Sequence, residues 1–160
     1  MPAKELELKH TVKLIQELDS EIDEIEIRIK EIMDEMDTPI LTIPGISYRM
    51  GAMILAEIGD FERFSSPDKI LAYAGLSPST YQSGQLTSSH SHMEKRGSRY
   101  LRYALFNATK FVCIWDPTFA EYFEKKRSEG KHYNVAISHA CKKLIRVIYH
   151  LQTTGEAYRS

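Results

Sequence analysis

Apolar residues recur every seven positions through the first forty residues of the chain. They form two rows, and the second follows three residues after the middle members of the first: Leu8, Ile15, Ile22, Ile29, Met36, then Leu18, Ile25, Ile32. This pattern predicts a coiled-coil helix within residues 1–38. Isoleucine in both rows does not select a number of strands. The alternative to self-association is a long helix that packs on its own domain.

After Pro39 the apolar positions have the period of amphipathic helices, and no stretch predicts a strand. Capping and turn residues place five further helices, at residues 48–58, 68–73, 99–114, 118–127 and 135–151. We therefore expect an all-α protein, with a coiled-coil helix at residues 1–38 followed by a compact helical domain at residues 39–155.

A Pro-Gly turn precedes the first helix of that domain, in the sequence Ile43-Pro44-Gly45-Ile46-Ser47. Helix, hairpin and helix in this order is typical of a helix-hairpin-helix element. Its backbone N–H groups can hold a DNA phosphate, so Gly45 and Ser47 are candidate DNA-binding residues. An ordinary helical hairpin with a Pro-Gly turn would have a similar sequence.

A polar segment at about residues 76–96 has neither helical nor strand period, and loops of this length are mostly functional or disordered. It ends in the basic run Lys95-Arg96-Gly97-Ser98-Arg99. Arg99 and Arg102 share a face of the next helix, where two cations oppose the helix dipole. A bound anion would relieve that repulsion. Lys95, Arg96, Ser98, Arg99 and Arg102 are therefore candidate DNA contacts.

Charge is divided unevenly along the 160 residues, although the formal net charge is only −1. Residues 1–40 hold five Lys/Arg and twelve Asp/Glu, a balance of −7, and the remainder has a balance of +6. A basic body suits a polyanion, whereas the acidic first helix would repel DNA.

The chain contains no apolar run long enough for a membrane span and begins with a charged segment. We therefore expect a cytoplasmic protein with no membrane partner.

Cys113 and Cys141 fall on apolar helical faces and are predicted to be buried, reduced thiols. No Cys/His cluster has the spacing of a zinc site, so we expect no metal in this chain.

Several short motifs occur together between about residues 40 and 155. They are Ile43-Pro44-Gly45-Ile46, Ala56-Glu57-Ile58-Gly59-Asp60, Ala74-Gly75-Leu76-Ser77-Pro78, Gln82-Ser83-Gly84, Lys95-Arg96-Gly97-Ser98, Leu101-Arg102 and Gly130-Lys131. In this order and spacing the sequence resembles the C-terminal transposase domain of the Piv-related, DEDD-type insertion-sequence transposases, a family that includes the bridge-RNA-guided recombinases.

The resemblance implies DNA transposition or site-specific recombination. In that family a serine before a glycine attacks DNA and forms a phosphoserine link, which maps the nucleophile to Ser83. An N-terminal RuvC-like domain holds Mg²⁺ through four acidic residues, and a coiled coil helps the protein assemble. Implied partners are DNA, a second copy of the chain and, for guided members, a guide RNA.

Residues 1–40 are too few and too heptad-like to contain the RuvC-like domain, so the chain resembles a truncated transposase or its C-terminal piece. From the residues alone, Ser83 competes with Ser77, Ser79, Ser88, Ser89 and Ser91. His90 and His92 are weak candidates for the base that activates it. Two other classes remain open: a non-catalytic helix-hairpin-helix DNA-binding module, and a coiled-coil interaction protein.

Overall fold

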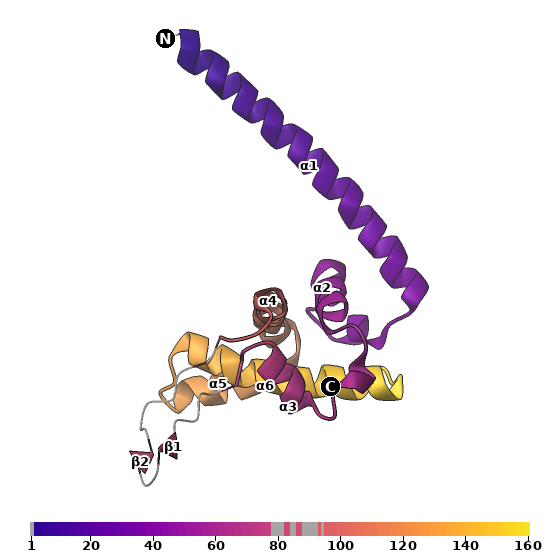
Figure 1. The fold of residues 1–160 in the computed structure, drawn as a ribbon, viewed down its shortest axis with the longest axis vertical. Helices are drawn as coiled ribbons and strands as arrows, with labels where there is room; N and C mark the ends of the chain where they lie inside the picture. Colours follow the sequence, from indigo (N-terminus) through magenta and orange to yellow (C-terminus); the bar gives the residue numbers. More distant parts are fainter. Residues whose placement is uncertain (1, 78–81, 84–85, 88–92, 94) are drawn as a thin grey trace. The chain divides into compact units, whose positions relative to one another are not determined.

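A computed structural model describes residues 2–77, 82–83, 86–87, 93 and 95–160. The protein is all-α, as predicted (Figure 1). Its helices are α1 (Pro2–Met36), α2 (Tyr48–Ile58), α3 (Pro67–Tyr73), α4 (Arg99–Trp115), α5 (Pro117–Ser128) and α6 (Tyr133–Thr154), with 3₁₀ turns η1 (Pro39–Thr42) and η2 (Phe61–Arg63). All six α-helices lie close to their predicted positions.

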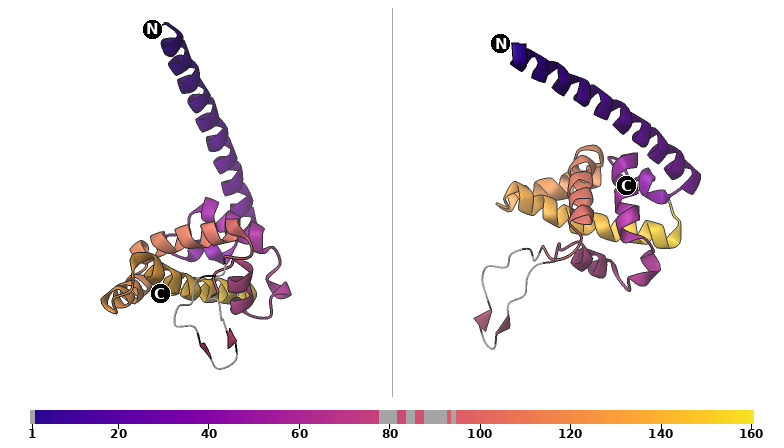
Figure 2. Two further views of the ribbon diagram at one scale, coloured as in Figure 1. Left: turned by 60° about the vertical axis from the view of Figure 1, so that its left-hand side comes forward. Right: turned by 45° about the horizontal axis from the view of Figure 1, so that its top comes forward.

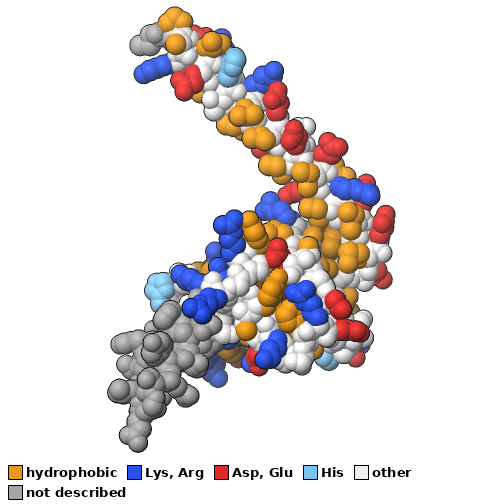
Figure 3. Space-filling model, viewed as in Figure 1, with side chains coloured by type: hydrophobic (Ala, Val, Ile, Leu, Met, Phe, Trp, Pro, Cys, Tyr) orange, Lys and Arg blue, Asp and Glu red, His pale blue; other side chains and the backbone are white. Residues whose placement is uncertain are grey.

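The chain divides into two compact units, residues 1–37 and residues 38–160. The first unit is α1 alone. Ion pairs such as Lys9–Glu5 and Lys30–Asp34 lie along its surface. In its two apolar rows every residue except Ile29 is between 43% and 64% exposed. Figure 3 shows these side chains as apolar patches along the helix.

The helices of the second unit start where short polar side chains can cap them. The Ser47 hydroxyl accepts a hydrogen bond from the N–H of Met50 at the start of α2. Asp116 does the same for Phe119 at the start of α5, with Pro117 in the first turn. Each cap satisfies an N–H that has no partner within its helix, which is why the sequence located these starts well.

The core of the second unit lies where α4 and α6 meet. In Figures 1 and 2, α2 and α4 lie side by side and both cross α6. Helix α5 packs on α4 and α6, and α3 packs on α6. The buried side chains of these helices include Ile54, Leu101, Leu105, Phe119 and Leu144. Contacts with α2, α5 and α6 therefore hold α4 in place, including its first turn.

Both cysteines are free and buried, as predicted. Burial raises the pKa of Cys113 to about 11, with help from nearby Asp116, and that of Cys141 to about 12. In the part of the chain that the structure describes, no helix is long and apolar enough to cross a membrane.

Three expectations about individual segments were wrong. The polar loop contains a short antiparallel pair, β1 (Gln82–Ser83) and β2 (Leu86–Thr87), where no strand was expected. The helical period of the sequence also predicts that Phe111 and Val135 lie on buried faces, but these side chains are 52% and 44% exposed. Periodicity assigned a face to each residue, but the neighbouring helices do not cover those positions.

Candidate functional site

Helix α3 ends in a turn that requires glycine. Gly75 has a φ of +67°, and the N–H groups of Gly75 and Leu76 donate to the carbonyls of Ala72 and Leu71. This is the Schellman pattern, in which a left-handed residue lets the chain reverse after a helix. A Cβ at Gly75 would lie 2.5 Å from the carbonyl oxygen of Arg96, so the two ends of the polar loop touch here.

Hydrogen bonds join those two ends. The N–H of Lys95 donates to the carbonyl of Gly75 at 3.2 Å, and that of Ser98 to the carbonyl of Tyr73 at 2.8 Å. Gly97 lies between them with a φ of +118°. We call the paired segments 73–75 and 95–98 the neck of the loop.

Arg102 completes the neck from the first turn of α4. Its Nη1 donates to the carbonyls of Ala74, at 3.0 Å, and Lys95, at 3.3 Å. The guanidinium is half-buried and holds one carbonyl from each side of the neck. Arg102 therefore has a structural role that its sequence position did not indicate.

Three cationic side chains of the neck region are exposed: Lys95, Arg96 and Arg99. The guanidinium carbon of Arg99 lies 4.7 Å from the ring centroid of Tyr100, and its Nη2 donates to the Tyr100 hydroxyl. Tyr100 and Tyr103 are themselves more than half exposed. The first turn of α4 thus combines cations with exposed aromatic rings, a combination suited to nucleic acid.

The neck is tied to α2 by a carboxylate. The Ser98 hydroxyl caps α4 by accepting from the N–H of Leu101, and it donates to Oε2 of Glu57 in the last turn of α2 at 2.5 Å. This contact joins the start of α4 to the end of α2.

The Pro-Gly turn lies against the other half of α4. A Cβ at Gly45 would lie 2.6 Å from the backbone carbon of Phe111 and 2.7 Å from the nitrogen of Val112. Because the end of α2 meets the start of α4 at Glu57–Ser98, the two helices are antiparallel. Arg99 and Phe111 are twelve residues apart on α4, which is about 18 Å of helix. The structure therefore separates Gly45 and Ser47 from the basic neck.

For Ser83 the structure describes the main chain, which pairs with Leu86 across the β1–β2 hairpin. Gly84 lies outside the described residues, as do His90, His92, Pro78 and the competing serines Ser79, Ser88, Ser89 and Ser91. Ser77 is described and lies just beyond the neck. The neck thus holds the two ends of the segment that carries Ser83.

The described side chains do not fit a divalent metal ion. Among residues 2–77, 93 and 95–160, no three His, Cys, Asp or Glu side chains come together as a possible metal site. Glu57, the acidic side chain at the neck, is engaged with Ser98. We therefore derive no metal-dependent step from these residues.

Sequence reasoning missed two features of this region. It did not identify Glu57 as the partner of Ser98, since a contact across 41 residues leaves no local signal. It also overlooked Tyr100 and Tyr103. The sequence does contain a signal for their exposure. Each tyrosine comes directly before a buried residue of α4, Leu101 or Ala104, so the tyrosines point to the side of the apolar face.

Comparison with known proteins gives consistent matches. A model of the family described as Transposase IS116/IS110/IS902 matches residues 37–124. The chain is 33% identical over 126 residues to an uncharacterised 43.6 kDa protein of insertion element IS110 from Streptomyces coelicolor. It is 28% identical over 172 residues to an uncharacterised 42 kDa protein of IS900 from Mycobacterium paratuberculosis. It is 29% identical over 143 residues to a pilin gene-inverting protein from Moraxella bovis.

These matches cover most of the chain but less than half of each relative. They include 77%, 98% and 89% of this chain, in the same order, and 30%, 43% and 44% of the relatives. The matched family region contains the Pro-Gly turn, the neck and the whole of α4.

Proposed function

The chain belongs to the IS116/IS110/IS902 transposase family, and we propose that it is the part of such an enzyme that holds DNA and presents Ser83 as the nucleophile of strand cleavage and transfer. Its relatives include a protein of an insertion element and a protein that inverts a pilin gene. Movement of an insertion element and inversion of a gene both require DNA strands to be broken and rejoined.

One observation carries the proposal: the loop with Ser83 is closed at its base by a fixed, basic neck. Lys95, Arg96 and Arg99 are exposed there, next to the ends of the loop. Phosphoryl transfer requires cations that hold the charge of the phosphate oxygens in place. Hydrogen bonds from Ser98, Lys95 and Arg102 fix the backbone beneath these cations, which supports a role in positioning DNA.

The proposed step is a transesterification. Oγ of Ser83 attacks a DNA phosphorus, a serine–phosphate ester forms, and the bond from phosphorus to the leaving deoxyribose oxygen breaks. The serine proton passes to a base, and the leaving oxygen takes up a proton. Because one phosphate ester replaces another, a hydroxyl of a second strand can reverse the step and join the DNA anew.

Activation of Ser83 is proposed to come from outside these residues. The lysine and arginine side chains at the neck carry hydrogen-bond donors and no acceptor, so they do not serve as the base that takes the serine proton. A RuvC-like acidic domain with Mg²⁺ would supply this activation. On its own, the chain is then expected to bind DNA weakly and not to exchange strands.

The remaining parts have proposed roles in binding and assembly. The exposed apolar rows of α1 suit a coiled coil with a second copy of the chain. The turn at Gly45 with the capped start of α2 at Ser47 suits a helix-hairpin-helix contact to a second phosphate. The alternative function is a non-catalytic DNA-binding module. The capped start of α2 and the basic start of α4 favour it as well. A guide RNA is a further possible partner.

Trapping the covalent intermediate tests the assignment of Ser83. A full-length family protein that carries this chain is incubated with end-labelled DNA, then denatured and resolved on a gel. Ser83→Ala is expected to abolish the protein–DNA adduct, whereas the control Ser77→Ala retains it. An adduct of normal yield in Ser83→Ala would contradict the proposal and favour the non-catalytic alternative.

A further inference from the structure

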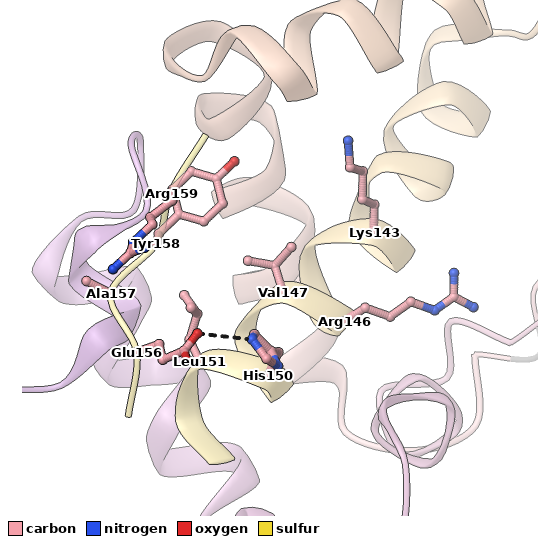
Figure 4. A pocket seen from close by; sticks show the side chains of 9 residues that line it. All are labelled: Lys143, Arg146, Val147, His150, Leu151, Glu156, Ala157, Tyr158 and Arg159. Atoms are coloured by element: carbon pink, nitrogen blue, oxygen red, sulfur yellow. Dashed lines mark ion pairs between the residues drawn. The ribbon is translucent and has the colours of Figure 1, made fainter. Parts of the chain in front are cut away.

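A pocket of about 400 Å³ lies between α6 and the segment at residues 155–160, and none of its lining residues belongs to the candidate sites described above. Figure 4 shows its side chains, which come from the last three turns of α6 and from the returning segment. Pockets of this size are typical of small-ligand sites. The sequence does not indicate this pocket, because the positions of Lys143 and Arg146 are typical of a solvated helix face.

The returning segment is held firmly enough to form a wall. Gly155 ends α6 with a φ of +73°, and its N–H donates to the carbonyl of Leu151. The N–H of Tyr158 donates to the Thr42 hydroxyl at 2.8 Å, and the Tyr158 hydroxyl donates to Oδ2 of Asp116 at 2.9 Å. Asp116 is fully buried, so the segment is anchored to the core.

The floor of the pocket is apolar. Leu151 is buried, and Val147 and the Tyr158 ring are half-buried. All three line the space, with Val147 and Tyr158 on its two sides (Figure 4). Such a floor favours a flat, weakly polar group over a bare ion, because an ion would lose its hydration there without gaining partners.

The rim of the pocket is cationic. Lys143, Arg146 and Arg159 line it, against one acidic side chain, Glu156, whose Oε2 lies 3.5 Å from Nε2 of His150. The ammonium of Lys143 lies 4.9 Å from the Phe119 ring centroid. Arg146 pairs with Asp68 at 3.3 Å, but both side chains are well exposed, so this pair is weak. The rim therefore favours an anion.

We propose that this pocket binds one unpaired nucleotide of a single strand, with the base on the floor of Val147, Leu151 and Tyr158 and the phosphate at the rim that Lys143, Arg146 and Arg159 line. A flat base and an adjacent phosphate match the two halves of the pocket, and unpaired bases commonly stack on aromatic side chains next to cations. A base within a duplex is stacked and cannot enter. The proposal extends the proposed DNA binding to a second site with separate residues.

Fluorescence anisotropy with the whole chain tests the pocket. The probes are a short oligothymidine strand, the same strand with abasic sites, and a duplex, all at one salt concentration. The chain is expected to bind the ordinary strand about tenfold more tightly than the abasic strand. Equal affinity for the two single strands would overturn the proposal, since only the base differs between them.

Variants of the pocket locate the effect. Val147→Phe fills the floor and is expected to remove the preference for the ordinary strand. Lys143→Ala with Arg159→Ala is expected to weaken single-strand binding at least fivefold and to leave duplex binding unchanged. The control Lys142→Ala, next to Lys143 but outside the pocket, should change neither. Retention of the base preference in Val147→Phe, with thermal unfolding showing a folded chain, would refute the site.

Competition and a neck variant separate the remaining outcomes. Thymidine monophosphate is expected to displace the strand at lower concentration than inorganic phosphate does; equal potency would reduce the pocket to a phosphate site and overturn the proposal. Arg99→Ala should weaken duplex binding and keep the base preference. If the wild-type chain does not bind the duplex but still prefers the ordinary strand to the abasic strand, the proposed DNA contact at the neck is wrong. The proposed nucleotide site is then still supported.

Discussion

Single residues decide whether the neck can form. Gly97 has a φ of +118°, and a Cβ there would lie 2.1 Å from the carbonyl oxygen of Tyr73, which accepts the hydrogen bond of Ser98. The basic run was recognisable in the sequence as a candidate phosphate contact. The reason for its glycine was not, because it depends on a carbonyl 24 residues earlier in the chain.

Replacing Gly97 tests the neck as a structural unit. Gly97→Ala is expected to lower the free energy of unfolding by about 1 to 3 kcal/mol, because the left-handed backbone disfavours a side chain and Tyr73 must move. Urea denaturation measures the change. Gly130→Ala is the control: its φ is +78°, but nothing lies within 4 Å of an added Cβ, so the loss should be smaller. A larger loss at Gly130 would show that the close approach at Gly97 does not matter.

Tyr158 makes stability depend on pH. Burial and the neighbouring Asp116 raise its pKa from 10.0 to about 12. The folded chain therefore keeps the phenol proton where the unfolded chain has lost it. The resulting stabilisation is complete below pH 10 and disappears as the pH rises towards 12.

Tyr158→Phe is expected to be less stable than wild type at neutral pH, because Asp116 loses a buried hydrogen-bond donor. The difference in unfolding free energy should shrink between pH 10 and pH 12. Denaturation curves at several pH values measure it, with the exposed Tyr103→Phe as control. A difference that stays constant up to pH 12 would mean that Tyr158 does not titrate in this way.

At the scale of elements, the sequence predicted where the helices begin and end but not which helices pack against each other. Caps such as Ser47, Ser98 and Asp116 mark helix starts through local hydrogen bonds, so their positions are readable. The antiparallel packing of α2 on α4 depends on contacts such as Gly45 with Phe111, which are far apart in sequence. This packing places the Pro-Gly turn and the basic neck at opposite ends of α4.

Helix α1 offers a test of assembly. Ile22→Asp with Ile25→Asp puts charges in both apolar rows, and burying each would cost several kcal/mol. The chain is expected to change from an oligomer to a single copy in sedimentation equilibrium. The control Asp23→Asn with Glu24→Gln alters neighbouring residues outside the rows and should leave the mass unchanged. If wild type and the isoleucine variant have the same mass, α1 does not mediate self-association.

At the scale of the whole molecule, charge is divided unevenly along the chain. The acidic excess lies in residues 1–40 and the basic excess in the remainder. This division of charge can be read directly from the sequence. The short motifs of the sequence also indicated the family, which the match over residues 37–124 confirms. It could not predict the pocket beside α6, since that forms only when the segment after Gly155 returns to Thr42 and Asp116.

The salt dependence of duplex binding tests the central claim most directly, namely that the basic neck holds DNA. Each phosphate contact removed is expected to reduce the slope of log affinity against log salt by about one. The account predicts that Lys95→Ala, Arg96→Ala and Arg99→Ala together lower the slope by about three. The control removes three exposed lysines of the acidic helix α1, Lys4→Ala, Lys9→Ala and Lys13→Ala, and should keep the wild-type slope. Equal slopes for the two triple variants would contradict the claim.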